Sequence, residues 1–348
     1  MEKIFILTDY KNIFGSKHNA TPYRSGMDKD LLKKYFEESN FEVNFLEFYE
    51  IDFRKMNFKD KYVLYTSSED IGYHYKDYIE DIILGLHLQG AILIPEYKYL
   101  RANSNKVFME ILRDQMNLDS IKNIKSHHFG TIEELNNRID EFTFPVVIKS
   151  AAGAMSSGVR LAHNKKELIK IAKRLSRTKY LYDELWDYGR SIKHKGYIRE
   201  SKYRKKFIIQ DFTPGLKNDW KILVFGDRYY IFLRPSRKND FRASGSGADK
   251  YIYGKNFFIP DGIFDFAKSV FEKIKAPFLS IDIGYNEKDF YLFEFQVIYF
   301  GTVGHERSSC YYVNENSSWI EKKNALDIEK VYVDSIVKFI NRKFGGSN

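Results

Sequence analysis

The chain has 348 residues, of which 43% are hydrophobic and 30% charged, an ordinary composition for a soluble globular protein of two or three lobes. Its only cysteine, Cys310, excludes an internal disulfide, no signal-peptide core follows the first residues, and no run approaches the roughly 18 apolar residues of a membrane span. We therefore expect a cytoplasmic protein without a membrane-spanning segment.

The net charge of +9 is concentrated in one segment. Residues 165–206 contain 15 Lys and Arg but only five Asp and Glu, which accounts for the whole excess. Such a segment is suited to nucleic acid, to an anionic membrane surface or to a polyanionic substrate, but it is equally typical of a solvated helix and loop. The charge alone does not decide among these.

The first hundred residues alternate between strand and helix patterns. Short apolar runs predict strands, and longer segments with apolar residues about 3.6 positions apart predict helices. In chain order the expected elements are strand 3–8, helix 27–39, strands 43–48 and 61–67, helix 73–90 and strand 91–95. This alternation is typical of a small parallel α/β layer.

The rest of the chain mixes helices with strands that favour antiparallel pairing. A hairpin is expected around Gly226-Asp227, because this turn dipeptide separates two apolar runs. The other expected elements are helices 105–116 and 131–142, strands 144–150 and 159–162, helix 165–176, strand 206–212, helix 261–274, the strands of 281–296 and helix 327–344. The fold class is therefore α/β plus α+β.

Loop 151–159, with the sequence AAGAMSSGV, joins two expected strands and contains two glycines and two serines. Its backbone can approach a ligand closely and offer N–H groups and hydroxyls to an anion. Lys149 precedes it at the end of an apolar strand and can reach a phosphate as a point charge. The loop is not the phosphate-binding loop of the P-loop NTPases, because it opens no helix and lacks that motif.

Between about Lys106 and Gly301, several separated motifs occur in an order that resembles the ATP-grasp superfamily, and within it the RimK-like carboxylate-amine ligases. The resemblance implies an ATP-grasp fold preceded by a parallel α/β domain. It divides the chain into residues 1–100, a first lobe at 101–212 with a basic insertion at about 180–206, and a second lobe at 213–348.

The resemblance also implies roles for residues around ATP. Lys106 and Lys149 match the two lysines that contact the phosphates, and the small-residue loop would cover the phosphates. The hinge that receives adenine matches IIQDF, and the D-x-[RK] strand matches Asp219 and Lys221. The implied ATP-binding residues are thus Lys106, Lys149, Gly153, Ser156, Ser157, Gly158, Gln210, Asp211, Phe212, Asp219 and Lys221.

Three further positions match the catalytic part of the family pattern. Arg234 is implied at the terminal phosphate, and Arg242 with Ser244 at the acyl-transfer centre. Phosphorylating a carboxylate brings negative charges together, so arginines are physically required there. As isolated residues, Arg234 and Lys221 would more often be surface strand cations.

The implied metal ligands are Asp282, Glu294 and Gln296. Glu294 and Gln296 face the same side of a strand, and if Asp282 stands directly opposite Glu294, the connection contains a bulge or a five-residue loop. Carboxylate oxygens suit Mg²⁺. The family has Asn where this chain has Gln296, which is one methylene longer. A buried pair satisfied by Arg or Lys is the structural alternative.

The resemblance implies an ATP-dependent ligase that joins a carboxylate to an amine through an acyl phosphate. Its cofactors would be ATP and two Mg²⁺ ions, with Mn²⁺ as an alternative metal. The partners would be a small-molecule, peptide or sugar carboxylate and an amine, rather than nucleic acid. Two alternatives stay open, a kinase of the same fold and a nucleotide-sensing module that binds polyanions. His127 and His128, in an expected loop, and His305 are expected at the surface.

Overall fold

The computed structural model describes residues 2–121, 124–153, 158–216, 218–235 and 250–344. Contacts between Cα atoms divide the chain into two compact units. The first unit contains residues 1–103 and 216–348, and the second contains residues 104–215. The three-domain division expected from the sequence stays a prediction.

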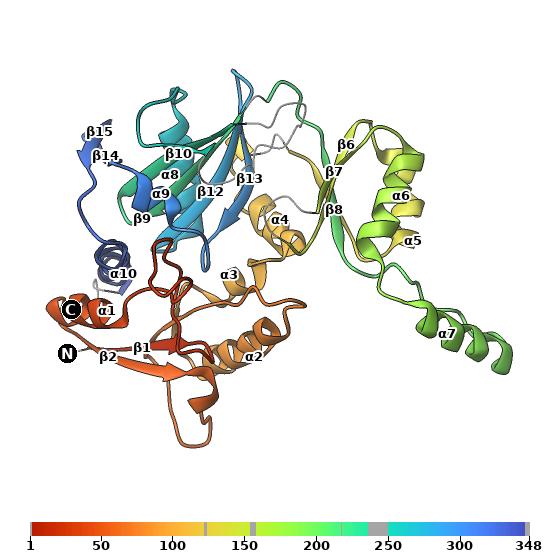
Figure 1. Ribbon diagram of the computed structural model, residues 1–348, viewed down its shortest axis with the longest axis horizontal. Coiled ribbons are helices and arrows are strands. Elements are labelled where there is room, and N and C mark those ends of the chain that lie inside the picture. Colours follow the sequence, from red (N-terminus) through yellow and green to blue (C-terminus); the bar gives the residue numbers. More distant parts are fainter. Residues whose placement is uncertain (1, 122–123, 154–157, 217, 236–249, 345–348) are drawn as a thin grey trace. The chain divides into compact units, whose positions relative to one another are not determined.

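The first unit begins with a parallel sheet in the order β2-β1-β3-β4. Figure 1 labels its neighbouring strands β1 and β2. Apolar runs fill the central strands, as expected for a parallel sheet with helices beside it. Its elements are β1 Glu2–Thr8, α1 Lys29–Glu38, β2 Phe41–Glu47, η1 Phe48–Glu50, β3 Tyr62–Tyr65, α2 His74–Leu88, β4 Ile92–Ile94 and α3 Tyr97–Ala102. The parallel α/β layer predicted for the first hundred residues is confirmed.

The same unit contains a seven-stranded sheet in the order β13-β12-β9-β10-β14-β15, with β11 paired to β10. Its elements are β9 Asn218–Phe225, β10 Arg228–Pro235, β11 Ile252–Tyr253, α8 Ile263–Ile274, β12 Phe278–Tyr285, β13 Phe290–Gln296, α9 Val303–Arg307, β14 Cys310–Glu315, β15 Ser318–Lys323 and α10 Ile328–Phe344. The hairpin at Gly226-Asp227 is confirmed, because Phe225 pairs with Arg228.

One apolar cluster explains why contacts group these two sheets into a single unit. It contains buried residues from β1, α1, β9, β12 and α10, among them Ile4, Phe36, Phe225, Phe278 and Ile336. Removing this much apolar surface from water favours joining the layers over keeping them as separate domains.

The second unit is built on an antiparallel sheet in the order β5-β8-β6-β7. Its elements are α4 Lys106–Asp114, η2 Asp119–Ile121, β5 Ser126–Phe129, α5 Ile132–Arg138, η3 Ile139–Glu141, β6 Val146–Ser150, β7 Val159–Ala162, α6 Lys165–Ser176, α7 Leu181–Lys193 and β8 Phe207–Asp211. Thr131 and Glu134 form a capping box that starts α5. A separate apolar cluster under α5 and α6 forms the core.

The loop expected at His127 and His128 is wrong, because both residues lie in strand β5 and pair with β8. The expected surface position holds for His128, which is exposed, whereas His127 is half-buried and the expectation for His305 is wrong. His305 lies in α9 and is only 2% exposed, because aromatic rings of Phe225 and Tyr230 surround it. Among the described helices, none is long and apolar enough to cross a membrane.

Candidate functional site

Four charged side chains share one face of the large sheet. Asp219 and Lys221 are two residues apart on β9 and so point to the same side. Strand register places Arg234 of β10 opposite Asp219, and Asp282 of β12 opposite Lys221. Antiparallel pairing of three neighbouring strands therefore gathers two cations and two carboxylates on one face of the sheet.

The members of this cluster are linked by ion pairs. Lys221 Nζ lies 2.8 Å from Asp282 Oδ1, and Arg234 Nη2 lies 2.8 Å from Asp282 Oδ2. Arg234 Nε donates to Asp219 Oδ1 at 2.5 Å. The Arg234 side chain is only 7% exposed. The four charges balance, which is the condition under which buried charges are tolerated.

The two carboxyl groups are held differently. Burial raises the pKa of Asp219 to about 6, with the charge of Asp282 adding to the effect and Arg234 opposing it. Burial also disfavours the charged form of Asp282, but Arg234 and Lys221 outweigh it and hold the pKa of Asp282 below its usual range. Asp282 is therefore the firmly ionised member of the pair.

Strand β13 brings Glu294 opposite Asp282. The register shifts between Asp282 and Ile283, so that Phe293 is the extra residue of a β-bulge. The expectation that direct pairing of the carboxylates would require a bulge or a longer loop is confirmed. Gln296 Nε2 donates to Glu294 Oε1 at 3.4 Å, so these two side chains share one face.

Carboxylates on paired strands are the donor type that Mg²⁺ prefers. In this arrangement, however, both oxygens of Asp282 contact cations. Within the described ranges, no three His, Cys, Asp or Glu side chains gather in a way that could hold a metal ion. The roles of Asp282, Glu294 and Gln296 as metal ligands stay predictions.

In the second unit, Lys106 lies at the start of the small-residue loop. Its Nζ donates to Gly153 O at 3.0 Å, and its backbone N–H donates to Ala151 O at 2.8 Å. Lys149, on β6, precedes the same loop. At the far end, a Cβ on Gly158 would lie 2.8 Å from the Cβ of Ser150, so the strand ends approach too closely for a larger residue.

Strand β8 contains the predicted adenine hinge. Gln210 is buried, and its Nε2 donates to Glu110 Oε1 at 2.6 Å and to Ser126 Oγ at 2.9 Å. The backbone N–H of Asp211 donates to Lys125 O at 3.1 Å. Phe212 follows the strand. Ser156, Ser157, Arg242 and Ser244 lie outside the described residues.

Sequence reasoning missed a buried polar network beside this hinge. Glu110 of α4 accepts a hydrogen bond from Ser126 Oγ at 2.8 Å and pairs with Arg113 at 2.5 Å. Burial raises the pKa of Glu110, whereas the charges of Arg113 and Lys149 oppose the rise. The only signal in the sequence was the spacing of Glu110 and Arg113 by three positions, which is typical of a solvated helical pair.

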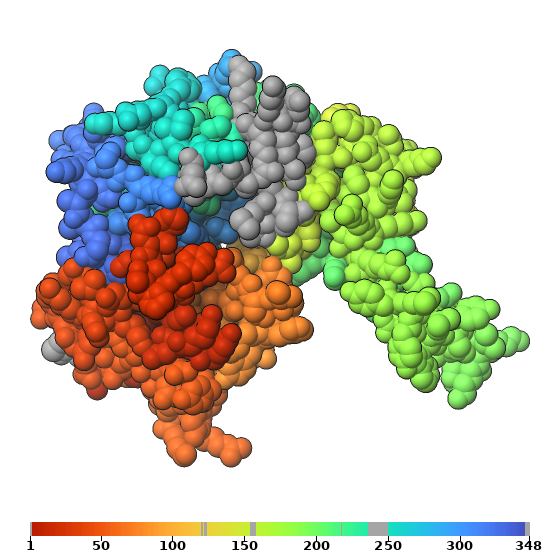
Figure 2. Space-filling model, viewed as in Figure 1, coloured from red at the N-terminus to blue at the C-terminus, as the bar shows by residue number. Residues whose placement is uncertain are grey.

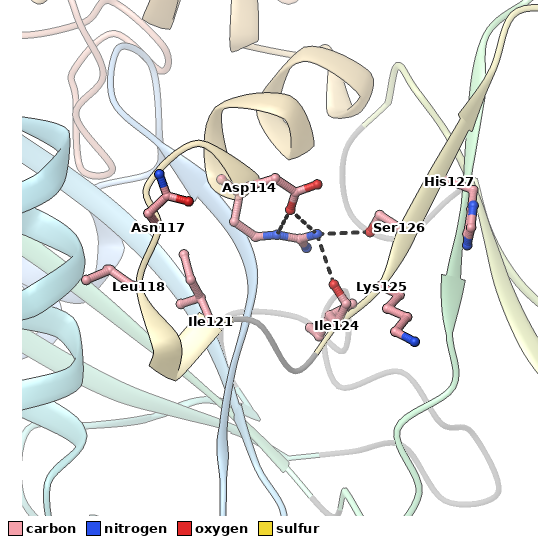
Figure 3. A pocket seen from close by; sticks show the side chains of 9 residues that line it. Asp114, Asn117, Leu118, Ile121, Ile124, Lys125, Ser126 and His127 are labelled. Carbon is pink, nitrogen blue, oxygen red and sulfur yellow. Dashed lines mark hydrogen bonds and ion pairs between the residues drawn. The ribbon is translucent and has the colours of Figure 1, made fainter.

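A cavity of about 340 Å³ adjoins this network in the same unit. The guanidinium of Arg113 donates to Asp114 Oδ1, to Ser126 Oγ and to the carbonyl of Ile124. Figure 3 labels these three acceptor residues among those that line the cavity. The lining residues are Arg113, Asp114, Asn117, Leu118, Ile121, Ile124, Lys125, Ser126 and His127.

Comparison with known proteins decides the fold. Residues 106–182 match the family model "Carbamoyl-phosphate synthase L chain, ATP binding domain". The structure is similar to D-cycloserine synthetase, with a TM-score of 0.57 and 9% identity over 97% of this chain and 99% of that one. The chain has the ATP-grasp fold.

Other proteins with the ATP-grasp fold are equally distant in sequence. One is a RiPP-associated ligase from Chryseobacterium gregarium, with a TM-score of 0.50 and 15% identity over 96% of both chains. Another is N5-carboxyaminoimidazole ribonucleotide synthetase, with a TM-score of 0.51 and 11% identity over 89% of this chain and 73% of that one. No curated protein matches the chain. The predicted ATP-grasp fold is confirmed, whereas membership of the superfamily and of its RimK-like subgroup stays a prediction.

Proposed function

We propose that the protein is an ATP-dependent ligase that joins a carboxylate to an amine. In the first step a carboxylate oxygen of the substrate attacks the terminal phosphorus of ATP, and ADP leaves. In the second step the amine nitrogen attacks the acyl carbon of the resulting acyl phosphate, loses a proton, and phosphate leaves with the bonding electrons. An amide, ADP and phosphate are the products.

The charge cluster on the large sheet is the observation that carries this proposal. Arg234 and Lys221 are held in place by two carboxylates, so their positive charges are organised before any substrate binds. A reaction that brings a carboxylate against a polyphosphate gains most from such preorganised cations. In the proposed enzyme, Arg234 stabilises the terminal phosphate, and Arg242 with Ser244 serves the acyl-transfer step.

The donors on β12 and β13 fit Mg²⁺, which usually takes one or two protein carboxylates together with substrate phosphates. Asp282 and Glu294 would hold one ion, and the amide oxygen of Gln296 would contribute to a second. Mn²⁺ accepts the same oxygen ligands. Bound there, the metal would neutralise charge on the phosphates. Asp282 would have to exchange at least one of its cation contacts for the metal.

The second unit would supply the nucleotide-binding groups. Lys106 and Lys149 flank the start of the small-residue loop, where they would meet the phosphates. Gln210, Asp211 and Phe212 would form the adenine hinge, and the Glu110 network would keep the Gln210 amide fixed. The neighbours named as synthetases and ligases, two of them described in complex with ADP, support a nucleotide-dependent ligation.

The test is turnover with a trapping nucleophile. Purified protein is incubated with Mg-ATP, hydroxylamine and pools of carboxylic acids that include acidic amino acids, peptides and uronic acid derivatives. ADP release that depends on the acid, with equal formation of hydroxamate, is expected. ADP with a stable phosphorylated product and no hydroxamate would instead identify a kinase.

Two Glu→Gln variants on the same sheet distinguish a loss of the proposed metal ligand from a general effect on the sheet. Glu294→Gln keeps the shape of the side chain but removes the charge, so turnover should fall by at least about a hundredfold. Glu315→Gln, the same change on β14 of the same sheet, should leave turnover unchanged. Full activity of Glu294→Gln would refute the metal assignment, even if the ligase reaction itself were established.

A further inference from the structure

Helix α7 and the segment that follows it pack against each other through charges. Asp187 is buried at this contact, where Tyr197 Oη donates to it at 2.7 Å and Lys179 Nζ lies 3.0 Å away. One turn earlier on the same face, Glu184 pairs with Lys202 at 3.4 Å. The inner face of the helix is therefore polar, and its charges are already paired within the chain.

The outer face of α7 is apolar and exposed. Residues at positions i, i+4, i+7 and i+11 form one stripe, and two aromatic residues form the next. More than half of each of these side chains is accessible: Leu181, Leu185, Tyr188 and Ile192 in the first stripe, Tyr182 and Trp186 in the second. Figure 2 shows this part of the chain, in light green, extending away from the bulk of its own unit.

This polarity is the reverse of an ordinary surface helix, which turns its apolar stripe inward. A contiguous apolar face of this kind marks an interaction site. The charges around it indicate the partner. Arg190, Lys193 and Lys195 are exposed where the helix ends, and none forms an ion pair with a described residue. No acidic residue lies between Asp187 and Glu200.

We propose that α7 lies flat in the interface of an anionic phospholipid bilayer, with its apolar face among the acyl chains. Trp and Tyr prefer this interface, and Lys and Arg at the end of the helix meet the anionic headgroups. On the polar face, Asp187 and Glu184 are already paired with Lys179 and Lys202, so these two carboxylates do not meet the anionic headgroups as free charges. Its 13 residues, about 20 Å long, suit a helix that lies on a membrane.

The arrangement explains why the basic excess is located here. Cations scattered over a solvated helix would serve solubility, but here three of them adjoin an apolar aromatic face. A groove on a protein would also accept the apolar face, but it offers no general reason for three neighbouring unpaired cations. An anionic bilayer offers acyl chains to the apolar face and negative headgroups to the three cations.

The experiment uses the full-length protein and vesicles of phosphatidylcholine with or without about 30% phosphatidylglycerol. Co-sedimentation measures the partition coefficient, and Trp186 emission reports insertion through a blue shift. We expect binding to the anionic vesicles, weakened by salt, with a blue shift that Trp186→Phe removes. Neither readout depends on turnover, so this proposal and the ligase proposal fail separately.

Matched variants test the two parts of the surface. Arg190→Glu with Lys193→Glu and Lys195→Glu should lower the partition coefficient by at least about a hundredfold, since each cation near an anionic surface contributes about a factor of five and each new carboxylate adds repulsion. The same charge change at three exposed lysines of α6 should alter it less than about threefold. These control positions are Lys166, Lys170 and Lys173.

Leu185→Ser tests the apolar face, and Leu88→Ser, on α2, is its matched control because both leucines are exposed on helices. Only Leu185→Ser should weaken vesicle binding. Wild-type protein that ignores anionic vesicles at low salt would overturn the proposal. Concentration-dependent dimers that Leu185→Ser abolishes, without vesicle binding, would assign the face to a second copy of the chain.

Discussion

Replacing Arg234 with Met is expected to destabilise the first unit by about 3–5 kcal/mol, because removing one partner of a buried ion pair leaves an uncompensated charge. Arg234 contacts Asp219 at 2.5 Å and Asp282 at 2.8 Å, and its side chain is 7% exposed. The wild-type cluster has no net charge. In the variant, Lys221 alone faces two carboxylates.

The measurement is urea unfolding followed by tryptophan fluorescence in a Trp186→Phe background. The two remaining tryptophans, Trp220 on β9 and Trp319 on β15, both belong to the first unit, so the signal reports that unit alone. Arg228→Met is the matched control. It removes an ion pair to Asp334, 3.0 Å long, at the other end of β10, where the partners are more exposed, and should cost no more than about 1 kcal/mol.

A second substitution separates charge from packing. Asp219→Asn added to Arg234→Met restores a neutral cluster of Lys221 and Asp282, so it should recover at least about half of the lost stability. If Arg234→Met costs less than about 1 kcal/mol, or if the added Asp219→Asn gives no recovery, the cluster is not held by its charge balance.

Three other changes have defined outcomes. Burial lowers the pKa of His305 to about 4, below its value near 6.5 in an unfolded chain, so the unfolded state binds more protons between these values. The free energy of unfolding should therefore have its full value above about pH 6.5 and fall by about 3 kcal/mol toward pH 4. In urea unfolding measured across this pH range, His305→Gln should flatten the fall. An unchanged slope would contradict the assignment to His305. Gly284→Ala places a Cβ against the ring of Phe293. This clash should lower the free energy of unfolding by about 1–3 kcal/mol and reduce turnover, because it displaces the bulge. Turnover equal to that of the wild type would show that the bulge tolerates the shift. Lys149→Met should weaken nucleotide binding at least about tenfold in a calorimetric titration, and unchanged affinity would remove Lys149 from the proposed phosphate contacts.

Much of the fold followed from local patterns. The N-terminal alternation predicted a parallel layer, and the turn dipeptide Gly226-Asp227 predicted a hairpin whose register the structure confirms. Register then explains the charge cluster, because residues two apart on a strand share a face and neighbouring strands align them. Sequence reasoning had placed Asp219 and Arg234 near ATP, but it did not predict that they would bond to each other.

The features that sequence reasoning missed depend on contacts distant in the chain. Glu110 and Gln210 are 100 residues apart, and nothing near either residue indicates that they are bonded. Helix α7 was not among the predicted helices, although its apolar residues recur at helical spacing, because the segment was interpreted from its charge, which is equally typical of a solvated helix and loop. Strand β5 was missed because its sequence, SHHF, has little of the β-branched and aromatic character of a strand.

The bulge at Phe293 decides which side chains of β13 lie on the same face of the sheet as Asp282. If pairing continued unbroken from Tyr285 and Phe290, Phe293 would stand opposite Asp282, and Glu294 would face the other side of the sheet. Because Phe293 is the extra residue of the bulge, Glu294 instead of Phe293 stands opposite Asp282. A chain that kept Phe293 but paired it with Asp282 would therefore keep Asp282, Glu294 and Gln296 in its sequence, and yet Glu294 and Gln296 would point to the opposite face from Asp282.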